Sequence, residues 1–270
     1  MPAIQPARLK TQAAKIGDLF QEPAALVRAL HSLLDFYADR TRRPGKTGAP
    51  PPLLQAYQVP KPVMRQIWQV FLPRIDEDPQ AGFRLADALW AEKNLECRIL
   101  AIQILGRLPV TPPEGVVRRL SSWVTEETDQ SLQRLLLTTG AARLRAEAPD
   151  QLFRLAKNWL SSADRYIPRL GLQILLPLIE DPDFDNLPFI FRMLRPLTLR
   201  LPSGERPYFL QVVEALAQRS PQETVFFLRE NLTGGQDTDL AALIRRSLSF
   251  FPDEHQASLR ESLRSTGRPL

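Results

Sequence analysis

The candidate functional residues of this chain are arginines, whose type and placement suit them to bind phosphate. Arg169 follows the polar turn Ser161-Ser162-Ala163-Asp164, at the start of a long apolar run, and Arg165 lies beside the turn. Guanidinium groups favour bidentate contact with phosphate, so an arginine where one helix meets the next could hold a DNA backbone. An ion pair of Arg169 with Glu180 or Asp164 is the alternative, and the residues leave both open.

Further basic residues on three predicted helices could extend this surface, although the commoner role of such residues is a solvated helix charge. They are Arg118, Arg119, Arg134, Arg143, Arg145, Arg154 and Lys157. Trp123 ends a predicted helix beside polar residues, so we expect it to be exposed and available to DNA. In contrast, Trp68, Trp90 and Trp159 fall in phase with apolar neighbours and are expected in the core.

Other residue types that catalyse reactions or bind metals are scarce. Cys97 is the only cysteine, and the histidines are His31 and His255. An internal disulfide is excluded, a zinc site is disfavoured and Cys–His catalysis has no support. There is no glycine-rich phosphate loop and no Ser-His-Asp motif. We therefore expect no metal and no cofactor, with Cys97 acting as a small buried hydrophobic residue.

The composition limits the classes of protein to which this chain can belong. The 270 residues are 44% hydrophobic and 24% charged, as in soluble globular proteins. The net charge is +5, of which residues 1–49 contribute +4 through eight basic and four acidic residues. That excess is either a solvated tail or an arm for nucleic acid or a protein partner. No apolar run could span a membrane and no secretory signal is present, so we expect a cytoplasmic protein.

The elements that must position these residues are helices. Apolar residues recur at three and four positions, and many of the 25 prolines stand between such segments, as helix punctuation does. Helix pairs recurring every 35 to 45 residues or so predict an all-α, HEAT-like solenoid of roughly a dozen helices. We expect a helical extension and Pro-rich linker over 1–49, with the linker at 40–52, and a repeat domain over 50–270.

Four motifs follow one another along the body of the chain. They are Tyr57-Gln58-Val59-Pro60 with Arg65 and Ile67; Leu89-Trp90 with Glu96, Arg98 and Ala101; Trp159 to Arg169; and Arg219-Ser220-Pro221 with Val225 and Leu228. Their order and spacing over about 53–232 resemble the AlkD-like DNA alkylation-repair glycosylases, built of HEAT-like repeats. The family patterns are Y-G-V-P with R-x-I, L-W with E-x-R-x-x-A, W-x-x-S-x-x-x-W-x-R-R, and N-P-x-x-V-x-x-F.

The resemblance implies a concave basic face that holds duplex DNA. It also implies removal of cationic alkylpurines without base flipping, assisted by a carboxylate and tryptophans. An anion near the sugar is what an oxocarbenium-like transition state requires.

The sequence departs from the family pattern at the catalytic positions. Counting back from Gly140, the family's W-D-x-V-D segment falls on Thr128 to Leu132, so the catalytic aspartate position is Leu132. The later G-W-x-L-R-E segment has Gln211 in place of its tryptophan, and Pro168 replaces the first arginine of the R-R pair.

Asp129 remains, although its position is more typical of a helix cap. A shifted alignment would make Asp129, Glu127 or Glu126 the catalytic carboxylate, with Trp123 beside it.

Three hypotheses follow. The first is a protein that binds duplex or branched DNA by its backbone without excising bases, through Arg165, Arg169, Trp123, Arg118, Arg119 and Arg134. The second is an active alkylpurine glycosylase that uses Asp129 or Glu127. The third is a scaffold that binds another protein, as solenoids often do.

Overall fold

A computed structural model describes residues 5–39, 54–199, 202–232 and 238–266. Within these residues the chain is helical, and the only β pairing is an isolated bridge between Gln55 and Asn94. The expected all-α class is confirmed. The helices form two units, Met1–Gln151 and Leu152–Leu270, each described by itself.

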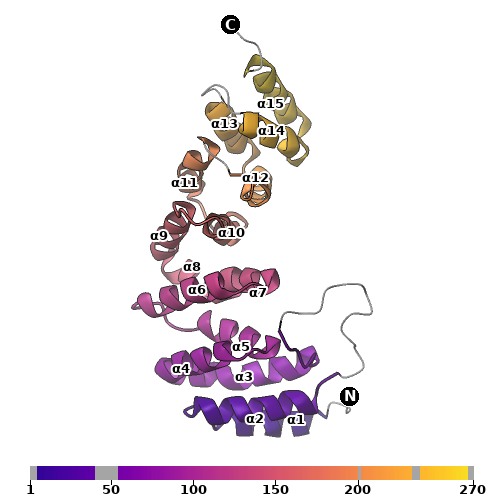
Figure 1. Cartoon of the computed structure of the whole chain (residues 1–270), viewed down its shortest axis with the longest axis vertical. Helices are drawn as coiled ribbons and strands as arrows, with labels where there is room; N and C mark the ends of the chain where they lie inside the picture. The colour runs from indigo at the N-terminus through magenta and orange to yellow at the C-terminus, as the bar shows by residue number, and fades with distance from the viewer. Residues whose placement is uncertain (1–4, 40–53, 200–201, 233–237, 267–270) are drawn as a thin grey trace. The chain divides into compact units, whose positions relative to one another are not determined.

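The first unit holds the helices up to the first residues of α9 (Figure 1). Their bounds are α1 (Pro6–Gly17), α2 (Pro23–Phe36), α3 (Lys61–Glu77), α4 (Pro79–Ala91), α5 (Leu95–Leu105), α6 (Glu114–Glu126), α7 (Gln130–Leu135), a π-helical turn (Leu136–Gly140), α8 (Ala142–Glu147) and α9 (Pro149–Leu160). Helices α1, α3, α5 and α7 contact one another in sequence, and α2 contacts α4.

The second unit repeats this two-row packing. Its helices are the rest of α9, then α10 (Ile167–Ile179), α11 (Leu187–Leu199), α12 (Arg206–Arg219), α13 (Pro221–Leu232), α14 (Thr238–Ser247), a 3₁₀ turn (Leu248–Phe250) and α15 (Asp253–Thr266). One row runs α10, α12 and α14, and the other runs α11, α13 and α15. A helix that contacts the helix two places along is the packing of a helical-repeat array, as expected.

The sequence around Asp78 and Asn94 predicts a helix cap at each, and these caps explain where two helices begin. Asp78 accepts a hydrogen bond from the backbone N–H of Ala81 at the start of α4, and Asn94 accepts one from Cys97 at the start of α5. These side chains occupy backbone donors that have no partner inside the helix. The break expected near Pro23 separates α1 from α2, and Pro62 lies in the first turn of α3.

One expected helix is interrupted. The apolar residues after Asp129 predict a single helix into Ala142, whereas the structure has α7, the π-helical turn and α8. A Cβ on Gly106, at the end of α5, would lie 2.1 Å from the carbonyl oxygen of Thr139 in that turn. Only glycine permits such an approach of two backbones.

The N-terminal helices pack on the body of the first unit, since α1 contacts α3 and α2 contacts α4. The linker predicted at 40–52 lies outside the described residues. The domain boundary at 49/50 stays a prediction.

Candidate functional site

The corner between α9 and α10 holds two of the predicted DNA-binding arginines. Arg165 is exposed, and its guanidinium carbon lies 6.0 Å from the ring centroid of Tyr166. The guanidinium carbon of half-buried Arg169 lies 5.7 Å from the same centroid. The Tyr166 side chain itself is 61% exposed. The corner therefore presents one aromatic ring with two cations beside it.

Local hydrogen bonds set the geometry of this corner. The hydroxyl of Ser162 accepts from the backbone N–H of Asp164, and the Asp164 carboxylate accepts from that of Tyr166 at 2.7 Å. A Cβ on Gly171 would lie 2.8 Å from Cγ of Leu160, so glycine lets the start of α10 approach the end of α9 closely. The sequence analysis did not single out Tyr166, although its place in a polar turn between two arginines was a signal for it.

The arginines predicted on α6 and α7 differ in availability. Arg119 forms two hydrogen bonds with the carboxylate of Asp87, at 2.7 and 2.6 Å, and its guanidinium carbon lies 4.5 Å from the ring centroid of Phe83. Arg118 and Arg134 are exposed. A bidentate partner already satisfies the geometry that phosphate would use, so Arg119 is the poorest candidate of the three.

The expectation that Trp123 is exposed is wrong. Its side chain is 5% exposed and stacks on Trp90, with ring centroids 4.6 Å apart and an interplanar angle of 7°. The reason is helical phase, because Trp123 shares a face of α6 with buried Val116 and Leu120. Trp90 and Trp159 are buried as predicted, and Trp68 is only partly buried.

Glu127 is occupied by structural contacts on both carboxylate oxygens. Oε2 accepts from Nη1 of Arg98 at 2.5 Å, and Oε1 accepts from the backbone N–H groups of Thr128 and Asp129 at 2.8 Å each. The Glu127 side chain is only 2% exposed. The guanidinium carbon of Arg98 also lies 4.7 Å from the ring centroid of Trp90, so this ion pair borders the tryptophan stack.

Asp129 is a helix cap. Its Oδ1 accepts from the backbone N–H groups of Ser131 and Leu132, at 2.8 and 3.2 Å, at the start of α7. Leu132, at the resembled family's catalytic position, is 2% exposed. Glu126 accepts a hydrogen bond from the hydroxyl of Ser122. Asp129 thus caps a helix, Glu127 forms an ion pair, and Glu126 makes a surface contact.

The structure brings Cys97 to a histidine that the sequence did not pair with it. Sγ of Cys97 lies 4.0 Å from Nε2 of His31, whose two ring nitrogens also contact the hydroxyl of Tyr57 and the carboxylate of Glu92. Burial, together with Glu92 and Glu96, raises the pKa of the Cys97 thiol to about 12. The thiol is therefore protonated at neutral pH and is not a nucleophile.

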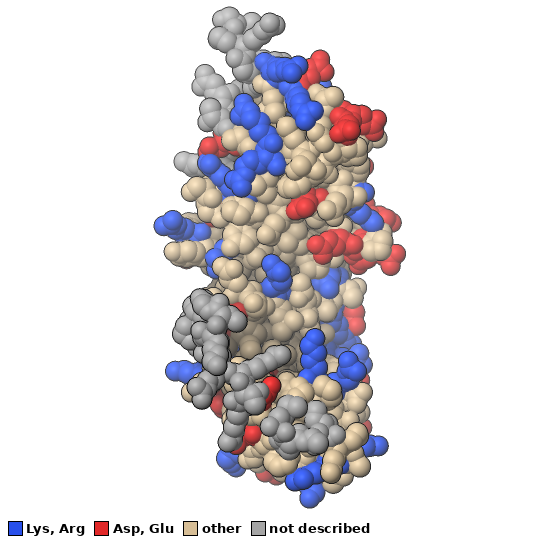
Figure 2. All heavy atoms as spheres, turned by 90° about the vertical axis from the view of Figure 1, so that its right-hand side faces the viewer, with Lys and Arg blue, Asp and Glu red and all other residues tan. Residues whose placement is uncertain are grey.

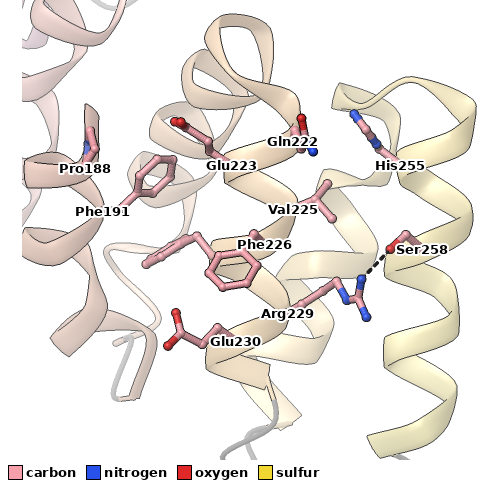
Figure 3. Close-up of a pocket in the computed structure, with 11 residues that line it drawn as sticks. Pro188, Phe191, Gln222, Glu223, Val225, Phe226, Arg229, Glu230, His255 and Ser258 are labelled. Atoms are coloured by element: carbon pink, nitrogen blue, oxygen red, sulfur yellow. Dashed lines mark hydrogen bonds between the residues drawn. The ribbon is translucent and has the colours of Figure 1, made fainter. Parts of the chain in front are cut away.

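A hollow of about 790 Å³ lies in the second unit between α11, α13 and α15 (Figure 3). Phe191 and Phe226 line it, and the side chain of Phe226 is 69% exposed. Across the hollow, Nη1 of Arg229 donates to the hydroxyl of Ser258 at 3.1 Å. Phe226 therefore contributes exposed apolar surface to this hollow.

Charges on the second unit are unevenly spread. On the face in Figure 2, Lys and Arg side chains gather over its C-terminal helices, and Asp and Glu side chains lie toward one edge. Exposed arginines of these helices include Arg245 and Arg246 of α14 and Arg260 of α15.

The described residues contain no group of three or more potential metal ligands and no helix long and apolar enough to cross a membrane.

Comparison with known families identifies the chain. The model of a family described as DNA alkylation repair enzyme matches residues 53–195, which are 143 of the 270 residues. The chain belongs to this family. No match was found among curated proteins or among solved structures.

Proposed function

We propose that this member of the DNA alkylation repair enzyme family binds duplex or branched DNA by its backbone and does not excise bases. The observation that carries the proposal is the α9–α10 corner, where Arg165 and Arg169 lie beside the exposed ring of Tyr166. Guanidinium groups contact phosphates and an aromatic face accepts sugar or base, a combination common in nucleic-acid-binding proteins.

The contacts of the carboxylates support the proposed absence of excision. An anion must stand free beside the sugar to stabilise an oxocarbenium-like transition state. Glu127 accepts three hydrogen bonds and Asp129 accepts two, all from the protein itself. Leu132 contributes a buried apolar side chain where the family pattern has its acid. Recruiting either carboxylate for catalysis would uncap α7 or break a buried ion pair.

Two measurements on the full chain test the proposal. Fluorescence anisotropy with duplex, nicked and four-way-junction DNA should detect binding at low salt that weakens steeply as salt rises. Failure to bind any of these DNA molecules at low salt would contradict the DNA-binding part of the proposal. Release of methylated purine from alkylated DNA, measured with folded protein, should stay at the uncatalysed rate. Measurable release would favour the glycosylase hypothesis instead.

A protein partner is the second candidate, favoured by the exposed Phe226 in the hollow of the second unit. Apolar contact predicts an association that resists salt, unlike binding to phosphates. This function would be favoured if a chain with no DNA affinity captured a partner protein. The association should survive about 0.5 M salt and should be lost in Phe226→Ser. An association through the N-terminal extension would survive Phe226→Ser.

A further inference from the structure

Helix α13 presents a stripe of exposed side chains to the hollow between α11, α13 and α15. They are Gln222, Glu223, Phe226, Arg229 and Glu230, and all of them line the hollow. Residues three and four apart share one face of a helix, so the stripe is centred on Phe226. At 69% exposed, Phe226 is the most exposed large apolar residue that the structure describes.

The two edges of this stripe differ in charge. Glu223 and Glu230 lie on the side of α11, whereas Arg229 lies on the side of α15 (Figure 3). Arg229 donates to the hydroxyl of Ser258 of α15 at 3.1 Å, and a carboxylate oxygen of Glu230 lies 3.7 Å from Nη2 of Arg195 of α11. The stripe is therefore acidic toward α11 and basic toward α15, with an aromatic ring between the two edges.

Each acid of one edge has a residue of the other edge as its neighbour in the sequence. Glu230 follows Arg229, and Glu223 follows Gln222. Consecutive residues of an α-helix differ by only about 1.5 Å along its axis, so the members of each pair stand at nearly the same height. A two-fold rotation about an axis parallel to α13 keeps every height and exchanges the two edges. It would bring Arg229 of a second copy opposite Glu230, and Gln222 of that copy opposite Glu223.

We propose that this stripe is the interface of a homodimer whose two-fold axis is parallel to α13. The two Phe226 rings pack against each other at the axis. Arg229 of each copy joins the Glu230–Arg195 ion pair of the other copy. An interface of this kind is isologous, so every contact away from the axis occurs twice.

The placement of the charges favours a second copy over an unrelated partner. A surface with charges of one sign repels its own copy and requires a partner of the opposite sign. This stripe carries both signs, and its own copy supplies the opposite charge where Glu230 and Arg229 lie. Aromatic rings pack favourably against one another, so Phe226 at the axis is compatible with the same symmetry.

Sedimentation velocity of the full chain tests the dimer. The sedimenting mass should rise from that of one chain toward that of two as the concentration increases from about 1 to about 200 µM, because mass action governs a weak association. Phe226→Asp should raise the dissociation constant at least about tenfold, since it places two carboxylates at the axis. A chain that stays monomeric over this range contradicts the proposal and leaves the hollow to a different partner.

Charge reversal tests the two-fold arrangement itself. Arg229→Glu and Glu230→Arg should each weaken self-association at least about tenfold, because like charges then face each other twice. An equimolar mixture of the two variants should associate about as tightly as wild type, because each reversed charge then meets its opposite. If both variants are folded by their melting curves and the mixture still fails to associate, the arrangement is wrong. A dimer that survives all three variants uses another surface and overturns the proposal.

The matched controls reverse exposed charges of the second unit that do not line the hollow. They are Arg245→Glu and Glu180→Arg, and both should dimerise as wild type does. The proposal is independent of DNA binding, because no residue of the stripe is among the proposed DNA contacts. Arg165→Ala and Arg169→Ala should therefore leave dimerisation unchanged, so failure of the dimer is distinct from failure of DNA binding.

Discussion

Trp90 of α4 and Trp123 of α6 lie parallel, with ring centroids 4.6 Å apart and an interplanar angle of 7°. Arg98, which pairs with Glu127, contacts the same Trp90 ring. Trp123 and Glu127, which the sequence analysis considered as a catalytic pair, thus belong to one packed cluster. A cluster of this kind stabilises the fold through burial, and it leaves the side chains of Trp123 and Glu127 only 5% and 2% exposed.

We expect Trp123→Ala to lower the free energy of unfolding by about 3–5 kcal/mol, because it opens a cavity in the core. The DNA affinity of the remaining folded protein should be unchanged. Urea denaturation and fluorescence anisotropy measure the two quantities, and Trp123→Phe serves as the milder control. Normal stability with lost DNA affinity would restore Trp123 as a DNA ligand.

Glu127→Gln should cost about 3 kcal/mol of stability, because it leaves the largely buried Arg98 without its counter-charge. Arg98→Ala should cost a similar amount, and the double variant should cost less than the sum of the two. Chemical denaturation of the three variants measures this coupling. Strictly additive losses would show that the ion pair contributes no coupling energy.

The role of Asp129 can be tested with variants that separate the charge of its side chain from the oxygen that caps α7. Asp129→Asn retains an acceptor for the N–H groups at the start of α7 and should leave stability nearly unchanged, whereas Asp129→Ala should cost about 1 kcal/mol. Thermal melting curves distinguish them. A base-release activity present in wild type and abolished in Asp129→Asn would identify this carboxylate as catalytic.

Arg165→Ala and Arg169→Ala should each weaken DNA binding about equally across sequences and reduce the salt slope of the logarithm of affinity by about 1. Each change would remove one of the proposed phosphate contacts and no base contact. Anisotropy titrations at four salt concentrations measure the slope, with Lys93→Ala as a control on the other unit. An unchanged slope in both variants would remove the α9–α10 corner from the interface.

Cys97 should resist thiol reagents in the folded protein. The pKa of its thiol is raised from 9.0 to about 12, so the folded state keeps a proton that the unfolded state releases above pH 9. Stability from this group is full below pH 9 and is lost as pH rises toward 12. Labelling with a chromogenic disulfide at pH 8 should proceed only as fast as the protein unfolds. Rapid stoichiometric labelling would contradict this.

Helix starts were the part of the fold that local sequence predicted best. Asp78, Asn94 and Asp129 cap helices because each acts on backbone groups within three residues of itself. The π-helical turn at Leu136–Gly140 was not predicted, since it accompanies a backbone approach from Gly106, which lies thirty residues or more away in the sequence.

The site was less predictable for the same reason. The bidentate pair of Arg119 with Asp87 and the ion pair of Arg98 with Glu127 depend on how one helix is placed against another. Periodicity within a helix cannot supply that placement. The error at Trp123 was different in kind, because the spacing Val116, Leu120, Trp123 already marked one helix face.

The two-row packing has a consequence for how the protein unfolds. Many helices contact helices one or two places along the chain, so these contacts join residues at short sequence separation. Order can then be lost one helix at a time from an end, where a helix has neighbours on one side only. Amide hydrogens of α15 should therefore exchange with solvent faster than those of α12, which contacts α10, α13 and α14.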